Sequence, residues 1–397
     1  MNVLVVAPAW IGDMVIAQSL LRLIAQRLPD ARIDVLAPRA TAALTERMPE
    51  VANTHTVGFG HGELAFFARR ALGRQLRGRF DWAIVLPNSW KSALVPFFAQ
   101  VPRRTGFVGE GRYGLLNDLR PAAGARLTRL VQRFAALGPD QAGGDPPPPR
   151  LAAPPAAAAR VRERLGVTGD RPVLALCPGA EYGAAKRWPP GYFAQVAKRH
   201  LRDGFHVWIL GGAADVAIAR DIANEVTGGT VSEVAVETAH EGSGRTAHEA
   251  SGKTAQEASG KTAHEVAGRT AHVVVGKATN KVAGGGGAGD AGNLFDLTGR
   301  TTLLEAVDLL SAAARVVSND SGLMHVAAAL GVPVVGIYGS SSPVFTPPLA
   351  ARAASVSLAL RCSPCFARTC RYGHYDCLRK LAPELVLSAL ARVTDGA

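Results

Sequence analysis

Residues 316–339, VVSNDSGLMHVAAALGVPVVGIYG, combine polar side chains with a pattern that could bind an anion. A β-branched run leads into the turn 318–322, an Ala-rich helix follows to Leu330, and a second strand is expected at 333–338. In open parallel sheets, ligands bind at such turns. A helix beginning with Asp320, Ser321 and Gly322 would present backbone N–H groups to a phosphate, with His325 about one turn further on. Alternatively, Asp320 or Ser321 merely caps the helix.

The loop 178–190, PGAEYGAAKRWPP, is a second candidate anion site, because it also lies between a predicted strand and a predicted helix. Lys186 and Arg187 would offer cations beside the backbone donors of a glycine-containing loop. The loop is neither a Walker A sequence nor a GxGxxG fingerprint, so nothing favours a P-loop nucleotidase or a dehydrogenase. A further glycine turn, 211–215, ends in Asp215, which could accept a hydrogen bond from a ribose or cap the next helix.

Asp13 is the candidate general base. It follows Gly12 at the expected start of a helix, directly after the first predicted strand. A carboxylate at the carboxyl end of a parallel strand would point into a ligand cleft. The alternative, an N-cap for the helix, is equally compatible with its spacing.

Four of the five cysteines are clustered late in the chain, at Cys362, Cys365, Cys370 and Cys377. The first pair has CxxC spacing, so the cluster could hold zinc. The second pair does not, which favours reduced, partly buried thiols. With no signal sequence before the strand at Val3, we expect neither a disulfide scaffold nor export, and we place the protein in the cytosol.

The chain has 397 residues, 48% of them hydrophobic, which is enough for two cores, and no apolar run is long enough to span a bilayer. Its net charge of +12 suggests an acidic partner. The charge concentrates between residues 69 and 133, where three acidic residues accompany thirteen basic ones: Arg69, Arg70, Arg74, Arg77, Arg79, Lys91, Arg103, Arg104, Arg112, Arg120, Arg126, Arg129 and Arg133.

Nucleic acid, anionic lipid and phosphorylated substrates would all be attracted to such a basic face, and a plain solvated surface is the simpler alternative. The chain contains no nucleic-acid motif, so we rank lipid or a phosphorylated glycolipid above nucleic acid.

Strand and helix patterns alternate twice, which predicts an α/β protein with parallel sheets covered on both faces. In the first half we expect strands at 2–8, 32–37, 54–59, 81–86 and 104–108, and helices at about 14–28, 41–48, 63–77, 89–100 and 126–137. In the second half, besides the elements of 316–338, we expect strands at 172–176, 206–210 and 295–297, and helices at about 191–202, 213–226 and 303–313.

The Pro-rich segment 138–155 reads as a linker, so the predicted domains are 1–150 and 151–397, enclosing a cleft. Residues 238–277 repeat every eight residues and lead to a Gly-rich stretch, 284–292. We interpret about 236–292 as a disordered insertion, because its composition could not bury a core. Its periodic histidines make a poor metal site: His240, His248, His264 and His272.

Five ordered motifs resemble the ADP-heptose:lipopolysaccharide heptosyltransferases of glycosyltransferase family nine: WIGD (10–13), LPNSWKSALVPFFAQVPRRTGFVGEGRYGLLNDLR (86–120), PGAEYGAAKRWPP (178–190), SNDSGLMHVAAALGVPVVGIYG (318–339) and CSPCFARTCRYGHYDCL (362–378). The resemblance covers nearly the whole chain except the octad repeats. The stretches LPNSWKSALVPFF and AKRWP favour the members that add the second heptose of the inner core.

Membership implies a GT-B fold of two Rossmann-like domains, an inverting mechanism, ADP-L-glycero-D-manno-heptose as donor and heptosyl-Kdo-lipid A as acceptor. It also implies work at the cytosolic face of the inner membrane, with peripheral attachment. We expect no cofactor and no obligatory metal, because no Asp-x-Asp pair follows a predicted strand.

Carried over by position, Asp13 matches the family's catalytic base and Lys186 its donor-phosphate lysine. The motif that holds the sugar-diphosphate is matched by Asp320, Ser321, Gly322, Leu323 and His325. To donor binding we further assign Gly179, Ala180, Arg187, Gly211 and Asp215. To acceptor binding we assign Trp10, Gly12, Asn88, Ser89, Lys91 and Arg112.

Three other interpretations remain open. A heptosyltransferase for a different core acceptor would share all of these motifs. A nucleotide-sugar epimerase could share the double fold but has no use for a basic acceptor face. A two-domain sugar-binding protein would normally require export.

Overall fold

The computed structural model describes residues 1–59, 62–121, 128–139, 145–228 and 291–395. The octad repeats, most of the Gly-rich stretch after them and Arg126 lie outside these ranges, so the expectations for them stay predictions. Among the described residues, no helix is both long enough and apolar enough to cross a lipid bilayer.

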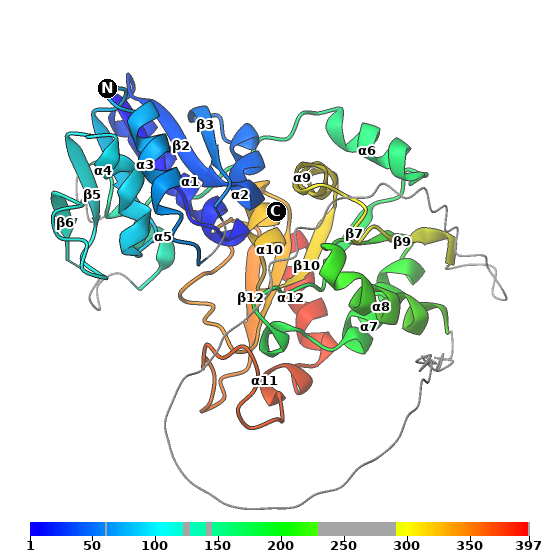
Figure 1. Cartoon of the computed structure of the whole chain (residues 1–397). Helices are drawn as coiled ribbons and strands as arrows, with labels where there is room; N and C mark the ends of the chain where they lie inside the picture. The colour runs from blue at the N-terminus through cyan, green and yellow to red at the C-terminus, as the bar shows by residue number, and fades with distance from the viewer. Residues whose placement is uncertain (60–61, 122–127, 140–144, 229–290, 396–397) are drawn as a thin grey trace, which may run out of the picture. The chain divides into compact units, whose positions relative to one another are not determined.

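The first half of the chain forms a parallel sheet in the order β3-β2-β1-β4-β5-β6 (Figure 1). Its strands are β1 (Asn2–Val6), β2 (Arg32–Pro38), β3 (Val51–Val57), β4 (Trp82–Val85), β5 (Arg103–Phe107) and β6 (Asp118–Arg120). The connecting helices are α1 (Ile11–Arg27), α2 (Arg39–Ala42), η1 (Ala43–Arg47), α3 (Phe66–Gln75), η2 (Trp90–Ala93), α4 (Leu94–Phe98) and α5 (Leu130–Ala135).

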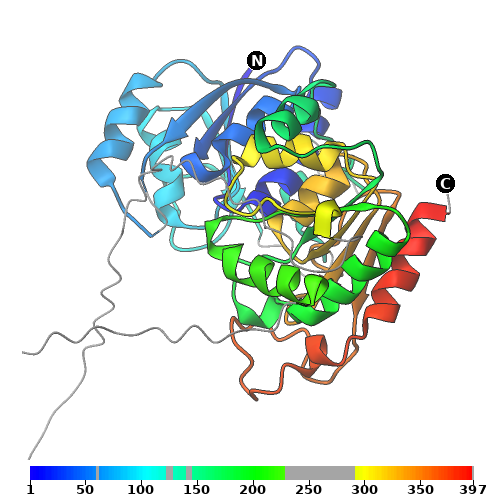
Figure 2. The same cartoon turned by 90° about the vertical axis from the view of Figure 1, so that its right-hand side faces the viewer.

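The second half repeats this arrangement, in the order β12-β11-β10-β7-β8-β9. Its strands are β7 (Val173–Cys177), β8 (His206–Ile209), β9 (Leu294–Asp296), β10 (Arg315–Asn319), β11 (Val334–Tyr338) and β12 (Ala353–Ser357). Its helices are α6 (Ala157–Leu165), η3 (Ala184–Lys186), α7 (Pro190–Arg202), η4 (Ala213–Asp215), α8 (Val216–Thr227), η5 (Ala291–Asn293), α9 (Leu303–Ser311), α10 (Gly322–Ala329), α11 (Asp376–Arg379) and α12 (Pro383–Asp395). Figure 2 shows α12, in red, lying against the strands β11 and β12.

Each sheet therefore has the doubly wound strand order, in which the chain reverses direction across the sheet at one point. That switch point lies between β1 and β4 in the first sheet and between β10 and β7 in the second. Asp13 follows β1, Asn88 follows β4, Lys186 follows β7 and Asp320 follows β10. All four candidate positions thus come after the strands that flank the two switch points, where ligands bind in such sheets.

The expected elements occur, with shifted ends. Not expected were the strands β6 and β12, the helices α6, α11 and α12, and the short segments η3 and η5. One expected helix, 89–100, is instead the short pair η2 and α4. Pro96 explains the difference, because a continuous helix would place a residue without an N–H group in its interior. α1 begins at Ile11 rather than at Met14, which puts Asp13 inside its first turn.

α1 and α10 are buried around much of their circumference, as expected of helices that pack on both sides. Consecutive residues 14–21 of α1 and 324–329 of α10 are buried. Met14 and Met324 belong to one continuous hydrophobic cluster, and the two helices contact each other. The two sheets are therefore joined through a shared apolar core that lies directly behind the candidate site.

The Pro-rich segment, expected to be a linker, is held at its end by specific bonds. The buried Gln18 of α1 donates to Arg150 O at 2.6 Å and accepts from Arg150 N at 2.9 Å. Leu151 N donates to Ala329 O of α10 at 2.9 Å. In addition, Arg47 of η1 and Asp308 of α9 form a two-pronged ion pair, with N···O distances of 2.8 Å. These bonds supplement the apolar core between the two halves.

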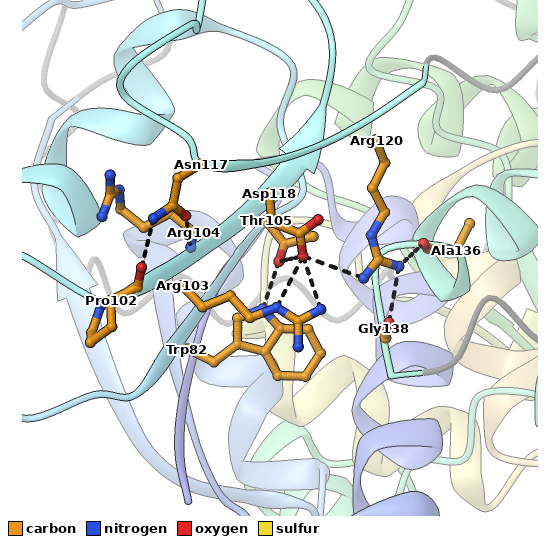
Figure 3. Close-up of polar contacts among 10 residues, drawn as sticks. All are labelled: Trp82, Pro102, Arg103, Arg104, Thr105, Asn117, Asp118, Arg120, Ala136 and Gly138. Atoms are coloured by element: carbon orange, nitrogen blue, oxygen red, sulfur yellow. Dashed lines mark hydrogen bonds and ion pairs between the residues drawn. The ribbon is translucent and has the colours of Figure 1, made fainter.

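Several basic residues of 69–133 are used inside the fold rather than on a solvated face. Figure 3 shows Asp118 accepting from Arg103 Nη2 at 2.9 Å and from Thr105 Oγ1 at 2.7 Å. The buried Arg120 donates to the carbonyls of Ala136 and Gly138. Arg104 donates to the Val101 and Leu115 carbonyls. These arginines fix β5 and the edge strand β6, so they contribute less to a basic face than the sequence suggested.

Candidate functional site

The first turns of α1 and α10 approach each other so closely that two glycines are required. A Cβ on Gly12 would lie 2.8 Å from His325 Cδ2, and a Cβ on Gly322 would lie 2.7 Å from Ile11 Cβ. Real Cβ atoms do not approach other heavy atoms this closely, so a side chain at either position would push the helix ends apart. The contact brings Gly12 and Asp13 of the first half beside Gly322 and His325 of the second.

Neither helix start is capped by a side chain. The N-cap residues, Trp10 and Ser321, make no side-chain cap hydrogen bond, and Ser321 Oγ lies 3.1 Å from Ser318 Oγ instead. Asp13 is the third residue of α1, so it is not an N-cap. Two helix N-termini therefore bring their positive dipole ends to the same place, which is an arrangement suited to an anion.

Lys186 and Asp320 form a short ion pair at this place. Lys186 Nζ lies 2.6 Å from Asp320 Oδ2, and the two side chains are 18% and 5% exposed. Asp320 is therefore engaged by a cation and is not a simple helix cap. His325 Nε2 lies 3.9 Å from the other Asp320 oxygen, and burial lowers the pKa of His325 to about 4, against the opposing effect of Asp320. His325 is consequently neutral at physiological pH.

Asp13 has the properties of a general base. Burial raises the pKa of Asp13 from 3.8 to about 6, with Lys186 lowering it and Asp320 raising it further. A carboxylate with a pKa near neutrality accepts a proton more readily than an ordinary aspartate and is still ionised at pH 7. The pairing of Lys186 with Asp320 limits how far the lysine can lower this pKa.

The loop that carries Lys186 is anchored by Asn319, which the sequence analysis did not single out. Asn319 is fully buried; its Nδ2 donates to Pro178 O at 2.6 Å, and its Oδ1 accepts from Trp188 N at 3.1 Å. Both ends of the loop are thus tied to the end of β10, next to Asp320. In the sequence, this role could have been inferred from the position of Asn319, an amide side chain in a strand-to-helix turn that otherwise consists mostly of small residues.

Asp215 organises the second group of expected donor residues. Its Oδ2 accepts from Gly212 N at 3.0 Å. A Cβ on Gly179 would lie 2.3 Å from that oxygen, and a Cβ on Gly211 would lie 2.9 Å from Asp215 Cβ, so a side chain at either position would displace Asp215. Of the remaining donor residues, Ala180 is buried, Leu323 is half-buried and Arg187 is exposed.

A cavity of about 560 Å³ lies at the carboxyl ends of β1 and β4. It is lined by Asp13 and by four of the six expected acceptor residues: Trp10, Asn88, Ser89 and Lys91. Gly12 does not line it and contacts His325 instead. Arg112 does not line it either, because its side chain is fully buried and donates to Pro87 O at 2.7 Å and to Phe107 O. Arg112 therefore supports the loop that carries Asn88.

Phe59, Arg69 and Glu110 are among the residues of the cavity wall that the sequence analysis did not assign there. Arg69 was expected on the exposed basic face, but it is only 7% exposed; its guanidinium lies 3.9 Å from the Phe59 ring centroid and donates to Leu64 O at 2.7 Å. Glu110 Oε2 accepts from Trp90 N at 3.1 Å. In the sequence, the role of Glu110 could have been inferred from its position as a single acidic residue between two glycines in a basic stretch.

The late cysteines gather at one place. Cys362, Cys365, Cys370 and Cys377 line a cavity of about 20 Å³ together with His374. Among the described residues, however, no three Cys, His, Asp or Glu side chains are arranged to hold a metal ion. Cys377 is half-buried, and burial with the three neighbouring thiols raises its pKa.

The raised pKa of Asp13 predicts that ionised Asp13 destabilises the fold. Below the unfolded-state pKa the carboxyl is protonated in both states; as the pH rises through about 6, the folded state loses stability relative to the unfolded state. A tenfold change in acidity is worth about 1.4 kcal/mol, so Asp13→Asn should raise the free energy of unfolding by up to about 3 kcal/mol at pH 7 and by little at pH 4, measured by urea denaturation.

Asp118→Asn is a control of opposite sign. Burial opposes ionisation there too, but hydrogen bonds from Thr105 and Arg103 lower the pKa of Asp118 overall. Its ionised form therefore stabilises the fold above the unfolded-state pKa, and the asparagine should be destabilising at pH 7. Equal stability of wild type and Asp13→Asn at pH 4 and pH 7 alike would contradict the predicted burial of the Asp13 charge.

Comparison with known proteins identifies the family of this chain. The sequence model of glycosyltransferase family 9 (heptosyltransferase) matches residues 69–239 and 286–376. Lipopolysaccharide heptosyltransferase 2 from Salmonella typhimurium and from Escherichia coli K12 are each 36% identical to this chain over 399 aligned positions, covering 98% of it and 97% of the relative. Lipooligosaccharide heptosyltransferase 2 from Haemophilus influenzae is 34% identical over 90% of this chain.

A solved structure, E. coli ADP-heptose lps heptosyltransferase II, superposes with a TM-score of 0.76 and 33% sequence identity, covering 100% of this chain and 99% of that one. This likeness and the two doubly wound sheets confirm the expected GT-B architecture. The chain belongs to glycosyltransferase family 9, the heptosyltransferases.

Proposed function

We propose that this protein is an inverting transferase that moves L-glycero-D-manno-heptose from ADP-heptose to heptosyl-Kdo-lipid A, adding the second heptose of the inner core. The named relatives support the substrate class. The observation that carries the mechanism is the position of Asp13, a carboxylate of raised pKa within electrostatic reach of Lys186 and beside the start of α10. This position places a general base for the acceptor hydroxyl beside an anion site for the donor diphosphate.

The reaction follows from these positions. The acceptor hydroxyl oxygen attacks the anomeric carbon of the donor heptose and gives its proton to Asp13. On the opposite face, the bond from that carbon to the diphosphate oxygen breaks, and ADP leaves with the electron pair, which inverts the anomeric configuration. Lys186 and the N-terminus of α10 stabilise the charge that the diphosphate gains. In this proposal they perform the role that a divalent cation has in metal-dependent glycosyltransferases.

We assign the acceptor to the half of the chain at residues 1–150 and the donor to residues 151–397. The cavity beside Asp13 supplies Trp10, Asn88, Ser89 and Lys91 to the acceptor, and Arg112 supports this wall from behind. Lys186, Arg187 and residues 320–325 face the sugar-diphosphate. Gly179 and Gly211 leave room for Asp215, which we assign with them to the nucleoside.

The lipid-linked acceptor also places the protein, in this proposal, at the cytosolic face of the inner membrane as a peripheral protein. The basic residues available for such a surface are fewer than the thirteen counted in the sequence. Arg69, Arg103, Arg104, Arg112 and Arg120 bond within the fold, whereas Arg74, Arg77 and Arg79 are exposed.

The proposed specificity is tested by ADP release from ADP-heptose with truncated acceptors that carry zero, one or two heptoses. Release should require an acceptor and should be fastest with one heptose. Preference for the acceptor without heptose, or for the one with two, would assign the protein to a different step of core synthesis. Release independent of any acceptor would contradict transfer altogether.

Asp13→Asn should lower kcat by about two to four orders of magnitude without weakening donor binding, because the amide keeps the shape but accepts no proton. In the wild type, kcat/KM for the donor should fall tenfold per pH unit below about 6, where Asp13 of the free protein becomes protonated. That acid limb should be absent from the residual activity of the variant. Near-normal turnover of Asp13→Asn would show that another group is the general base and causes the fall in activity at low pH.

Lys186→Ala should weaken ADP-heptose binding and also lower kcat, because the diphosphate charge is present in the ground state and grows in the transition state. Added Mg²⁺ should not restore the activity. A matched control is Lys380→Ala, which removes an exposed lysine paired with Asp376 on α11. Unchanged donor KM and kcat in Lys186→Ala, as in the control, would show that the lysine only balances Asp320.

A further inference from the structure

Four phenylalanines form an exposed aromatic cluster on α3 and α4. Phe66 contacts both Phe67 and Phe98 edge to face, with ring centroids 5.6 and 5.5 Å apart, and Phe97 contacts Phe98 at 5.4 Å. Phe67 is 80% exposed, and Phe66 and Phe97 are each 37% exposed. Single exposed apolar side chains are common, but aromatic rings in mutual contact on the surface mark an interaction site.

Basic residues predominate in the sequence around the cluster. Residues 64–80 and 89–104 contain five and three Lys or Arg residues, respectively, and no Asp or Glu. On α3, Phe67, Arg70 and Arg74 are spaced three and four residues apart, so they share one helix face, and Arg74 is exposed. Arg77 and Arg104 line a cavity of about 310 Å³ with Phe97, Phe98 and Gln100. The surface thus combines insertable apolar rings with cations.

α3 and α4 form one firm platform. They lie side by side in Figure 1, and a Cβ on Gly73 of α3 would lie 2.5 Å from Phe98 Cβ and 2.8 Å from Val95 O. The opposite side of α3 carries Arg69, whose side chain lines the cavity beside Asp13. Lys91 and Ser92 of η2, which leads directly into α4, line the same cavity. The same elements therefore border both the exposed aromatic cluster and the acceptor cavity.

We propose that this surface, defined by Phe66, Phe67, Phe97, Arg70, Arg74 and Arg77, docks the protein on a bilayer that contains anionic phospholipids. The phenylalanines enter the headgroup region and the arginines bind lipid phosphates, a combination typical of interfacial binding. The inference rests on the proposed function in one respect: a lipid-linked acceptor is what gives docking beside the cavity its purpose. A basic surface alone would bind any polyanion. The exposed rings favour a lipid bilayer over other polyanions, because they can be buried in its apolar interior.

Binding of the full-length protein to vesicles tests the proposal without reference to catalysis. Vesicles of phosphatidylcholine alone are compared with vesicles that also contain phosphatidylglycerol, by co-sedimentation at low and high salt. Phe67→Ser should reduce the partition coefficient on anionic vesicles about tenfold, because a largely exposed ring loses its burial in the lipid. Arg74→Gln with Arg77→Gln should reduce it about 25-fold at low salt, and the difference should shrink at high salt.

Matched controls come from the second half of the chain. Tyr372→Ser removes another exposed ring, at 60% exposure, and Arg202→Gln with Arg220→Gln removes two exposed charges from α7 and α8. Neither control should change vesicle binding. All variants should keep their kcat/KM on an acceptor stripped of its acyl chains, since none of the substituted side chains lines the acceptor cavity.

The outcomes separate the docking proposal from the proposed function. If Phe67→Ser and the double arginine variant both bind anionic vesicles with the partition coefficient of the wild type, the proposed docking surface is wrong, whatever the transferase activity. Loss of a dimer in Phe67→Ser, seen by sedimentation velocity, with vesicle binding intact would show that the rings cover a second copy of the chain. Vesicle binding that depends on Phe67 in a protein that transfers no heptose would uphold the surface and contradict the function.

Discussion

The contact between the first turns of α1 and α10 is the constraint on which the site depends. Gly12 and Gly322 leave no room for a Cβ against His325 and Ile11, so the two helix starts meet backbone to side chain. Because Asp13 follows Gly12 directly, its carboxylate is positioned by the second half of the chain as much as by its own sheet. A displacement of a few tenths of an ångström there would misalign the base with the donor, and reacting groups tolerate little misplacement.

The same contact accounts for the cost of the site. Packing α1 and α10 together buries Asp13 and His325, and burial opposes the charge of both groups, as the pKa of about 6 for Asp13 and about 4 for His325 show. His325 accommodates this by remaining neutral. Asp13 does not, because a base must be ionised at working pH. Function here is obtained at the expense of stability, and the continuous core of Met14 and Met324 offsets that cost.

Local pattern was sufficient where the chain alternates regularly. The strands before Asp13, Lys186 and Asp320 are short apolar runs, each followed by a turn that contains glycine, so their order and the placement of the three residues after strand ends could be predicted. β6 and β12 were missed because they lie at sheet edges, where partly exposed strands carry no continuous apolar run.

The burial and contacts of individual side chains were less predictable, because they depend on residues that are distant in the sequence. Arg69 and Arg74 look alike in a basic stretch, yet they lie on opposite faces of α3: Arg69 shares a face with the buried Gly73 and Leu76, and Arg74 is exposed. That difference could have been predicted from the spacing of these residues along the helix. The burial of Arg112 beneath Pro87 and Asn88 had no such signal, since it arises from strands β4 and β5 pairing across the sheet.

Donor binding should itself prepare the base. Lys186 pairs with Asp320 at 2.6 Å, and the lysine partly offsets the effect of burial on Asp13. A diphosphate at the same place adds negative charge near Asp13 and draws the lysine's charge toward itself, and both effects favour the protonated form of the carboxyl. The pKa of Asp13 should therefore be higher in the donor complex than in the free protein. Asp13 then becomes a stronger base at the stage when an acceptor hydroxyl must be deprotonated, and the acid limb of kcat, which reports the donor complex, should lie at higher pH than that of kcat/KM for the donor, which reports the free enzyme.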